Sequence, residues 1–196
     1  MNIQKYIEQT ILEKLIDKKL ITASEIPIYQ YGIQLLLVYL INISTFLFIG
    51  VIEKRFIEVV IFICTFVFIR CYAGGLHFVN AIHCYLGSTT LIYLFIYLYK
   101  LSLPSNVINI FFYLSSILIF IIAPIDNKNK KFDEIEQKYF SRKSKRNIVL
   151  VFFIYFFCVH QNFSQYRDII CIATVFNALN IVFAKIIKKY DTHIFL

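Results

Sequence analysis

The sequence has few charged residues, and this shortage excludes an ordinary soluble protein. Only 16% of the 196 residues are charged, whereas 59% are hydrophobic and 18% are aromatic. A soluble core formed by a chain of this length cannot hide so much apolar surface. The composition, with its mean hydropathy of +0.70, therefore predicts a membrane protein.

Glycine, proline and cysteine are also scarce. Five glycines and three prolines form no Gly/Ser linker, and no internal repeat divides the chain, so we expect residues 1–196 to form one domain. The five cysteines are odd in number and mostly lie in apolar runs, which argues against the disulfide framework of a secreted protein. Most of the net charge of +8 flanks apolar segments, so anionic lipid explains it better than nucleic acid.

Six apolar stretches follow one another along the chain, each near the roughly 17–25 residues that a bilayer core requires. They are residues 28–52, 56–72, 78–99, 105–123, 147–163 and 168–187, of which the fifth is the shortest. Before them, Ile3, Ile7 and Ile11 recur every four residues opposite Glu8 and Glu13, the pattern of an amphipathic helix. The sequence therefore predicts an all-α, polytopic membrane protein. An amphipathic helix (1–27) precedes about six transmembrane helices (28–187) and a cytoplasmic tail (188–196).

Positive charge predicts the orientation of these spans. With six spans and an internal amino terminus, sixteen lysines and arginines fall inside, and the outer loops hold only Lys54, Arg55, Lys100 and Arg167. This asymmetry favours a cell-membrane protein with both termini in the cytoplasm. The segment between the second and third spans then faces the cytosol, where reducing conditions keep cysteines free.

One polar segment interrupts the apolar sequence, and it carries the candidate chemistry. It runs from Arg70 to Ser88 and reads RCYAGGLHFVNAIHCYLGS. A cysteine within reach of a histidine can form a thiolate–imidazolium pair, which is a nucleophile at neutral pH. On a continuous helix, His77 and Cys84 would lie roughly 10 Å apart along the axis, but Gly74-Gly75 permits a turn that brings them together. Asn80, between them, is a candidate orienting residue.

Structural alternatives stand beside this interpretation. Cys64, Cys158 and Cys171 are typical of small hydrophobic residues in apolar helices. Cys71, His77, His83 and Cys84 have the ligand chemistry of zinc, but their spacing matches no closed finger pattern, so we predict neither a metal nor a cofactor.

Two further groups of basic residues are candidates for substrate binding. A guanidinium at the end of the second span, Arg70, is costly to leave unpaired, so it binds either a substrate carboxylate or carbonyl, or lipid phosphate. Lys128, Lys130 and Lys131 either form a solvated, lipid-facing end or hold the acidic tail of a peptide.

Arg70, Gly74-Gly75-Leu76-His77 and Cys84 resemble the signature of the accessory gene regulator B family, membrane-embedded cysteine endopeptidases of Gram-positive quorum sensing. Ala123-Pro124, followed by the lysine-rich run from Asn127 to Lys131, is similar to the segment that the family carries after its fourth span. The chain departs from the expected pattern at Phe78, where a small residue would follow the histidine. It also has Gln30 and Gln34 in the first span, where a carboxylate would be sought.

The resemblance implies a function for the polar segment. His77 and Cys84 would form a dyad that removes the carboxyl-terminal part of a small AgrD-like peptide precursor. Gly75 is a further candidate for binding or orienting the substrate. The amino-terminal part would be held as a thioester and released as a cyclic thiolactone or lactone. The sequence leaves open whether the protein forms a homodimer.

The alternative function is a non-catalytic transporter or export subunit for a peptide. A transporter ordinarily places ionisable groups near the middle of the bilayer, whereas the candidates Glu58, His160 and Asp168 lie near span ends, which argues against this alternative.

Overall fold

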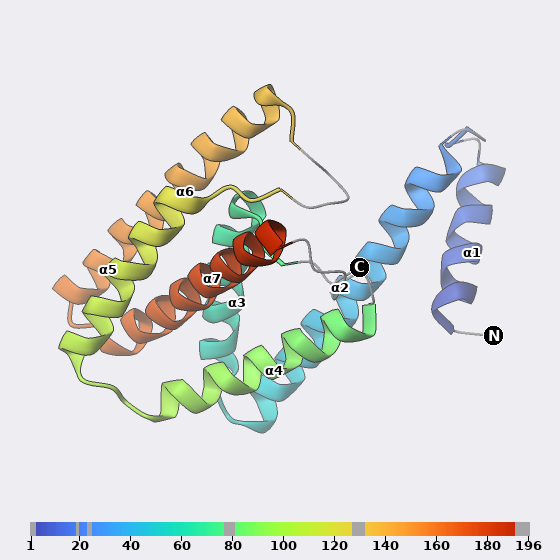
Figure 1. The fold of residues 1–196 in the computed structure, drawn as a ribbon. Coiled ribbons are helices and arrows are strands. Elements are labelled where there is room, and N and C mark those ends of the chain that lie inside the picture. Colours follow the sequence, from blue (N-terminus) through green and yellow to red (C-terminus); the bar gives the residue numbers. More distant parts are fainter. Residues whose placement is uncertain (1–2, 19, 23–24, 77–80, 127–131, 191–196) are drawn as a thin grey trace. The chain divides into compact units, whose positions relative to one another are not determined.

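A computed structural model gives the fold and describes residues 3–18, 20–22, 25–76, 81–126 and 132–190. Its described part contains seven helices and no strand, which confirms the all-α prediction (Figure 1). The helices are α1 (Ile3–Asp17), α2 (Ile26–Ile52), α3 (Phe56–Ala73), α4 (Ala81–Lys100), α5 (Ser105–Ile122), α6 (Glu134–His160) and α7 (Ser164–Tyr190).

Five of these helices, α2, α3, α4, α5 and α7, are long and apolar enough to cross a membrane. They coincide with five of the six predicted stretches, so the prediction of a polytopic membrane protein is confirmed. The sixth stretch, 147–163, lies in α6, which does not qualify. The first half of α6 is charged up to Arg146, so only the part from there to His160 is apolar. This part is roughly 20 Å long, which is shorter than the bilayer core of about 30 Å.

Helix α6 begins well before the predicted span at 147–163, and its charged first half is helical rather than a loop. The carboxylate of Asp133 caps the helix and accepts a hydrogen bond from the backbone N–H of Glu136 at 2.6 Å. Glu134 and Glu136 place two further carboxylates in the first turn, where the helix dipole favours negative charge.

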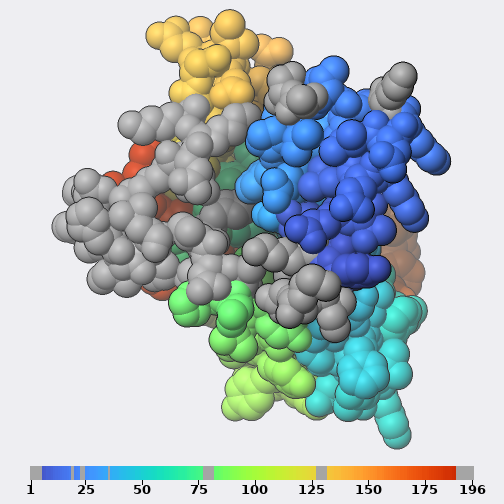
Figure 2. Space-filling model, turned by 90° about the vertical axis from the view of Figure 1, so that its right-hand side faces the viewer, coloured from blue at the N-terminus to red at the C-terminus, as the bar shows by residue number. Residues whose placement is uncertain are grey.

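The chain divides into two compact units, residues 1–48 and 49–196, and each is described by itself. In the first unit, α1 packs on the beginning of α2, and the side chains of the two form one continuous surface (Figure 2). Glu8, which the periodicity placed on the polar face, is instead buried with 3% of its surface exposed. Its carboxylate accepts hydrogen bonds from Gln30 at 2.6 Å and from Gln34 at 3.0 Å, whereas Ile7 is exposed.

In the second unit, α7 packs against α3, α4, α5 and α6, and α5, α6 and α7 run side by side (Figure 1). The rings of Phe112 and Tyr155 stack at 3.5 Å between α5 and α6. Ile69 and Ala73, on the last turns of α3, belong to the same core as Ile181 of α7. The carboxyl end of α3, where the polar segment begins, is therefore anchored in the core.

Candidate active site

The glycine pair forms the connection that leaves α3, called the turn below, and its backbone conformation favours glycine at both positions. Gly74 has φ +75° and Gly75 has φ +141°, in the region that side chains disfavour. A Cβ on Gly74 would lie 2.1 Å from the carbonyl oxygen of Ile125, and a Cβ on Gly75 would lie 2.0 Å from Oδ1 of Asn180. The pair thus adopts the kind of backbone conformation that glycine permits, and two other segments contact it directly, whereas the predicted approach of His77 to Cys84 stays a prediction.

The first of these segments is the stretch after α5, which carries the second motif of the sequence. The backbone N–H of Ile125 donates to the carbonyl of Ala73 at 3.0 Å, and Gly74 and Ile125 form an isolated parallel bridge. Ile125 directly follows Ala123-Pro124, which are joined by a cis peptide bond. The two motifs, about fifty residues apart in the chain, therefore meet through their backbones.

The second segment is α7, which reaches the turn through Asn180. The Oδ1 atom of Asn180 accepts hydrogen bonds from Nη1 of Arg70 at 2.6 Å and from the backbone N–H of Leu76 at 2.9 Å. Nη2 of Arg70 donates to the carbonyl oxygen of Leu76. The guanidinium thus contacts the protein's own turn, and the predicted contact of Arg70 with a substrate stays a prediction.

Two more asparagines donate hydrogen bonds to backbone carbonyls in the second half of α3. Nδ2 of Asn147, on α6, donates to the carbonyl of Phe68 at 2.7 Å, and Nδ2 of Asn177, on α7, donates to the carbonyl of Phe66 at 3.3 Å. Both side chains are 1% exposed. Amides from two helices therefore hold the end of α3 beside the turn.

Cys84 lies near the beginning of α4 as a free, half-buried thiol. Cys158 and Cys171 are buried, as predicted for small hydrophobic residues, but Cys64 and Cys71 are exposed on the protein surface. His83 is exposed. His77 and Asn80 lie outside the described residues, and among those described no group of metal-ligating side chains could hold a metal.

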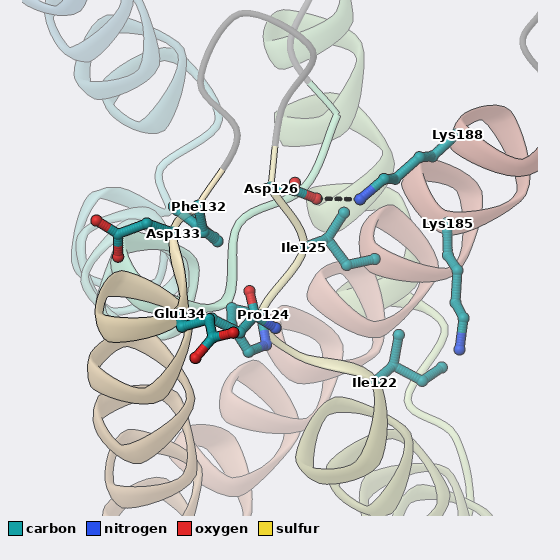
Figure 3. A pocket seen from close by; sticks show the side chains of 10 residues that line it. Ile122, Pro124, Ile125, Asp126, Phe132, Asp133, Glu134, Lys185 and Lys188 are labelled. Atoms are coloured by element: carbon teal, nitrogen blue, oxygen red, sulfur yellow. Dashed lines mark hydrogen bonds and ion pairs between the residues drawn. The ribbon is translucent and has the colours of Figure 1, made fainter.

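An open cavity of about 470 Å³ lies next to the Gly74–Ile125 bridge (Figure 3). Ile122, Pro124 and Ile125 supply its apolar lining, and Glu134 and Lys185 line it from α6 and α7. Lys188 and Asp126 form an ion pair at its edge. The predicted lysines Lys128, Lys130 and Lys131 lie outside the described residues, but Asp126 and Phe132, which flank that run, both line the cavity.

Comparison of the sequence with known protein families identifies the family of the chain. The family model described as "Accessory gene regulator B" matches residues 6–181, which include the glycine turn, Cys84, the Ile125 segment and Asn180. The chain belongs to the accessory gene regulator B family. Family members act in the processing of peptides in accessory gene regulator quorum sensing, and this chain is a membrane protein of that system. Neither a curated protein nor a solved structure matches the chain.

Sequence reasoning missed the asparagines of this accessory gene regulator B protein. Asn147 lies at the start of the apolar half of α6, Asn177 and Asn180 lie on α7, and no spacing between them marks a motif. A signal did exist, because an amide within an apolar span is costly unless it is hydrogen-bonded. The cost of an unpaired amide predicts that each asparagine has a hydrogen-bond partner, but it does not identify the partner. The partners are backbone groups of α3 and of the turn after it.

Proposed function

We propose that this protein is a membrane-embedded cysteine endopeptidase that cuts a small quorum-sensing propeptide. Cys84 acts as the nucleophile and His77 as the general base. One observation supports this most: the turn whose last described residue, Leu76, directly precedes His77 is fixed from two sides, and Cys84 follows near the start of α4. A reacting pair needs such support, because a displacement of about 1 Å can cost on the order of a hundredfold in rate.

The proposed reaction begins with attack of the Cys84 thiolate on the scissile carbonyl carbon. The tetrahedral intermediate collapses, the C–N bond breaks, and the imidazolium of His77 gives its proton to the departing amine. The carboxyl-terminal fragment leaves, and the amino-terminal part stays on Cys84 as a thioester. A thiol or hydroxyl of the bound peptide then gives its proton to His77 and attacks that thioester; the bond to Cys84 breaks, the Cys84 thiolate is restored, and a thiolactone or lactone closes.

The same proposal gives the substrate a place to bind. The cavity beside the Gly74–Ile125 bridge has an apolar lining and carries charges of both signs, which suits an amphipathic segment of an AgrD-like peptide precursor. Lys128, Lys130 and Lys131 would hold the acidic residues of that segment, and Asn80 would orient the dyad. The mechanism uses no metal and no cofactor.

For the orientation we propose that α6 crosses the membrane as the sixth span, with its charged first half in the cytoplasm. With six spans, both termini, and with them the site, face the cytoplasm. The basic residues concentrate on that side of the predicted topology, where anionic lipids attract them. A cytosolic precursor then has direct access to Cys84.

Cleavage by paired variants tests the proposed function. The protein is reconstituted with a small precursor peptide, and the products are identified by mass. Cys84→Ala and His77→Ala should each abolish cleavage while the protein still inserts, because a nucleophile and its base act as a unit. Cys71→Ala and His83→Ala serve as matched controls and should keep most of the activity.

Each contrary outcome has a defined meaning. Cleavage by Cys84→Ala would exclude Cys84 as the nucleophile, whereas absence of cleavage by the wild-type protein would favour a transport or export subunit. Loss of cleavage with a chelator, or inactive Cys71→Ala and His83→Ala variants, would instead support a zinc site.

A further inference from the structure

We propose that Asn180 is a positioning residue: its side chain fixes the backbone of Leu76, the residue directly before His77, and thereby restrains the proposed general base through the chain. This inference rests on the proposed dyad. It assigns a role to a residue of α7 that lies 104 residues beyond Leu76 in the chain.

The first step of the argument is that both backbone polar groups of Leu76 are held by side chains. The N–H of Leu76 donates to Oδ1 of Asn180 at 2.9 Å, and its carbonyl accepts from Nη2 of Arg70. These two side chains are bonded to each other, with 2.6 Å between Nη1 and Oδ1. Three groups thus form a closed ring around one backbone residue, which restrains the direction in which the chain continues.

The second step is that the backbone of the turn passes directly against Asn180. Gly75 adopts a φ of +141°, and a Cβ there would lie 2.0 Å from Oδ1 of Asn180 and 2.8 Å from Nη1 of Arg70. Glycine therefore permits the close approach, and the asparagine occupies the space that a side chain would take. The turn cannot shift toward α7 without moving Asn180.

The third step separates this role from general packing of α7 on α3. Ile69 and Ile181 already join the two helices in the core, and Asn177 donates to the carbonyl of Phe66. Asn177 lies one turn before Asn180 and contacts the body of α3 rather than the turn. The pair therefore offers a matched comparison, in which one asparagine supports the helix and the other supports the approach to His77.

The chemistry of the amide also predicts which substitutions are tolerated. The two lone pairs of Oδ1 are both used by the donors from Arg70 and Leu76, so the required function is that of a double acceptor. A carboxylate has the same shape and accepts both bonds, so Asn180→Asp should preserve the turn. Asn180→Ala removes the acceptor, leaving an amide N–H and a guanidinium with one partner fewer.

The test measures alkylation of Cys84 by iodoacetamide as a function of pH, with no peptide substrate present. The full-length protein is kept in nanodiscs, and modification is quantified at Cys84 alone by peptide mass analysis. An isolated thiol has a pKa of about 8.5, so only about 0.3% of it is thiolate at pH 6. A thiol paired with an imidazolium reacts at that pH.

The wild-type protein should be alkylated readily at pH 6, and Asn180→Ala should react at least tenfold more slowly there but approach the wild-type rate at pH 9. Asn180→Asp should keep the wild-type profile. Asn177→Ala should lower the thermal stability and leave the pH profile of Cys84 unchanged. With a peptide substrate, Asn180→Ala should lower kcat more than it raises KM.

A wild-type profile in Asn180→Ala would overturn the positioning role, and so would an alanine-like profile in Asn180→Asp. If Asn180→Ala does not fold, Asn180→Gln replaces it, because the added methylene moves the acceptor by about 1.5 Å. A wild-type profile in that variant would overturn the role equally. Failure of the dyad itself is distinguishable, since Cys84 of the wild-type protein would then be alkylated at pH 6 as slowly as in Asn180→Ala.

Discussion

The two glycines before His77 illustrate how single residues determine the site. Gly75 combines a positive φ with an approach to Asn180 that leaves no space for a methyl group. Both effects act on the folded state, so they add to the cost of any side chain at this position. The glycine pair is needed for the shape of the backbone and not merely for its flexibility.

Gly75→Ala should therefore destabilise the protein by more than about 1 kcal/mol and abolish peptide cleavage. Gly32→Ala is the matched control, because nothing lies within 4 Å of its added Cβ and alanine favours a helix by up to about 1 kcal/mol. Thermal unfolding in detergent measures both effects. A Gly75→Ala protein as stable and active as the wild type would contradict the tight turn.

Much of the neighbourhood of the site was predictable at this scale, and the reason for the rest is physical. Arg70, the glycine pair and Ala123-Pro124 are local patterns, and the structure joins them through the bridge of Gly74 with Ile125. Asn180 was not predictable, because its partners become neighbours only when α3 and α7 pack together. The contact between His77 and Cys84 stays a prediction.

Among the elements, hydropathy predicted the spans well and the amphipathic faces less well. Five predicted stretches agree with α2, α3, α4, α5 and α7 to within a few residues. The early start of α6 was missed because a charged helix has no hydropathy signal, although Asp133 provides a cap. The inward side of Glu8 was missed because Gln30 and Gln34, which bind it, belong to another helix.

The contact between Glu8 and the two glutamines predicts how α1 is held on α2. Glu8→Ala would remove the acceptor shared by the exposed Gln30 and the half-buried Gln34, and each lost hydrogen bond contributes about 0.5–1.5 kcal/mol. Hydrogen exchange of the α1 amides should become faster in this variant. Glu13→Ala, on the exposed side of the same helix, should not change it. Equal exchange in both variants would mean that the carboxylate does not hold α1.

For the whole molecule, the proposed function makes the membrane important for access to the site and for the fate of the product. In the proposed reaction the thioester keeps the activation that hydrolysis would waste, so a water-poor site at the membrane edge would favour ring closure. Conversion of an amide into a thiolactone is nevertheless uphill, and product accumulates only if the cleaved tail is removed. The proposed cytoplasmic position of Cys84 allows the tail to be released where proteases can degrade it.

The proposed topology predicts which cysteines are reached from outside. A membrane-impermeant thiol reagent added to intact cells should miss Cys71 and Cys84, because both lie inside in the proposed topology. Ser102→Cys, in the exposed connection between α4 and α5, should be labelled and serves as the positive control. Labelling of Cys84 without labelling of Ser102→Cys would reverse the orientation.

The most direct test of the central claim is to trap the acyl-enzyme. The protein is given a precursor peptide whose internal cysteine is changed to alanine, so that the thioester on Cys84 cannot close into a thiolactone. We expect a covalent adduct of the amino-terminal peptide on Cys84 that hydroxylamine releases, no ring product, and no adduct in Cys84→Ala. Unimpaired cleavage of that peptide with no adduct on Cys84 would contradict the thioester mechanism.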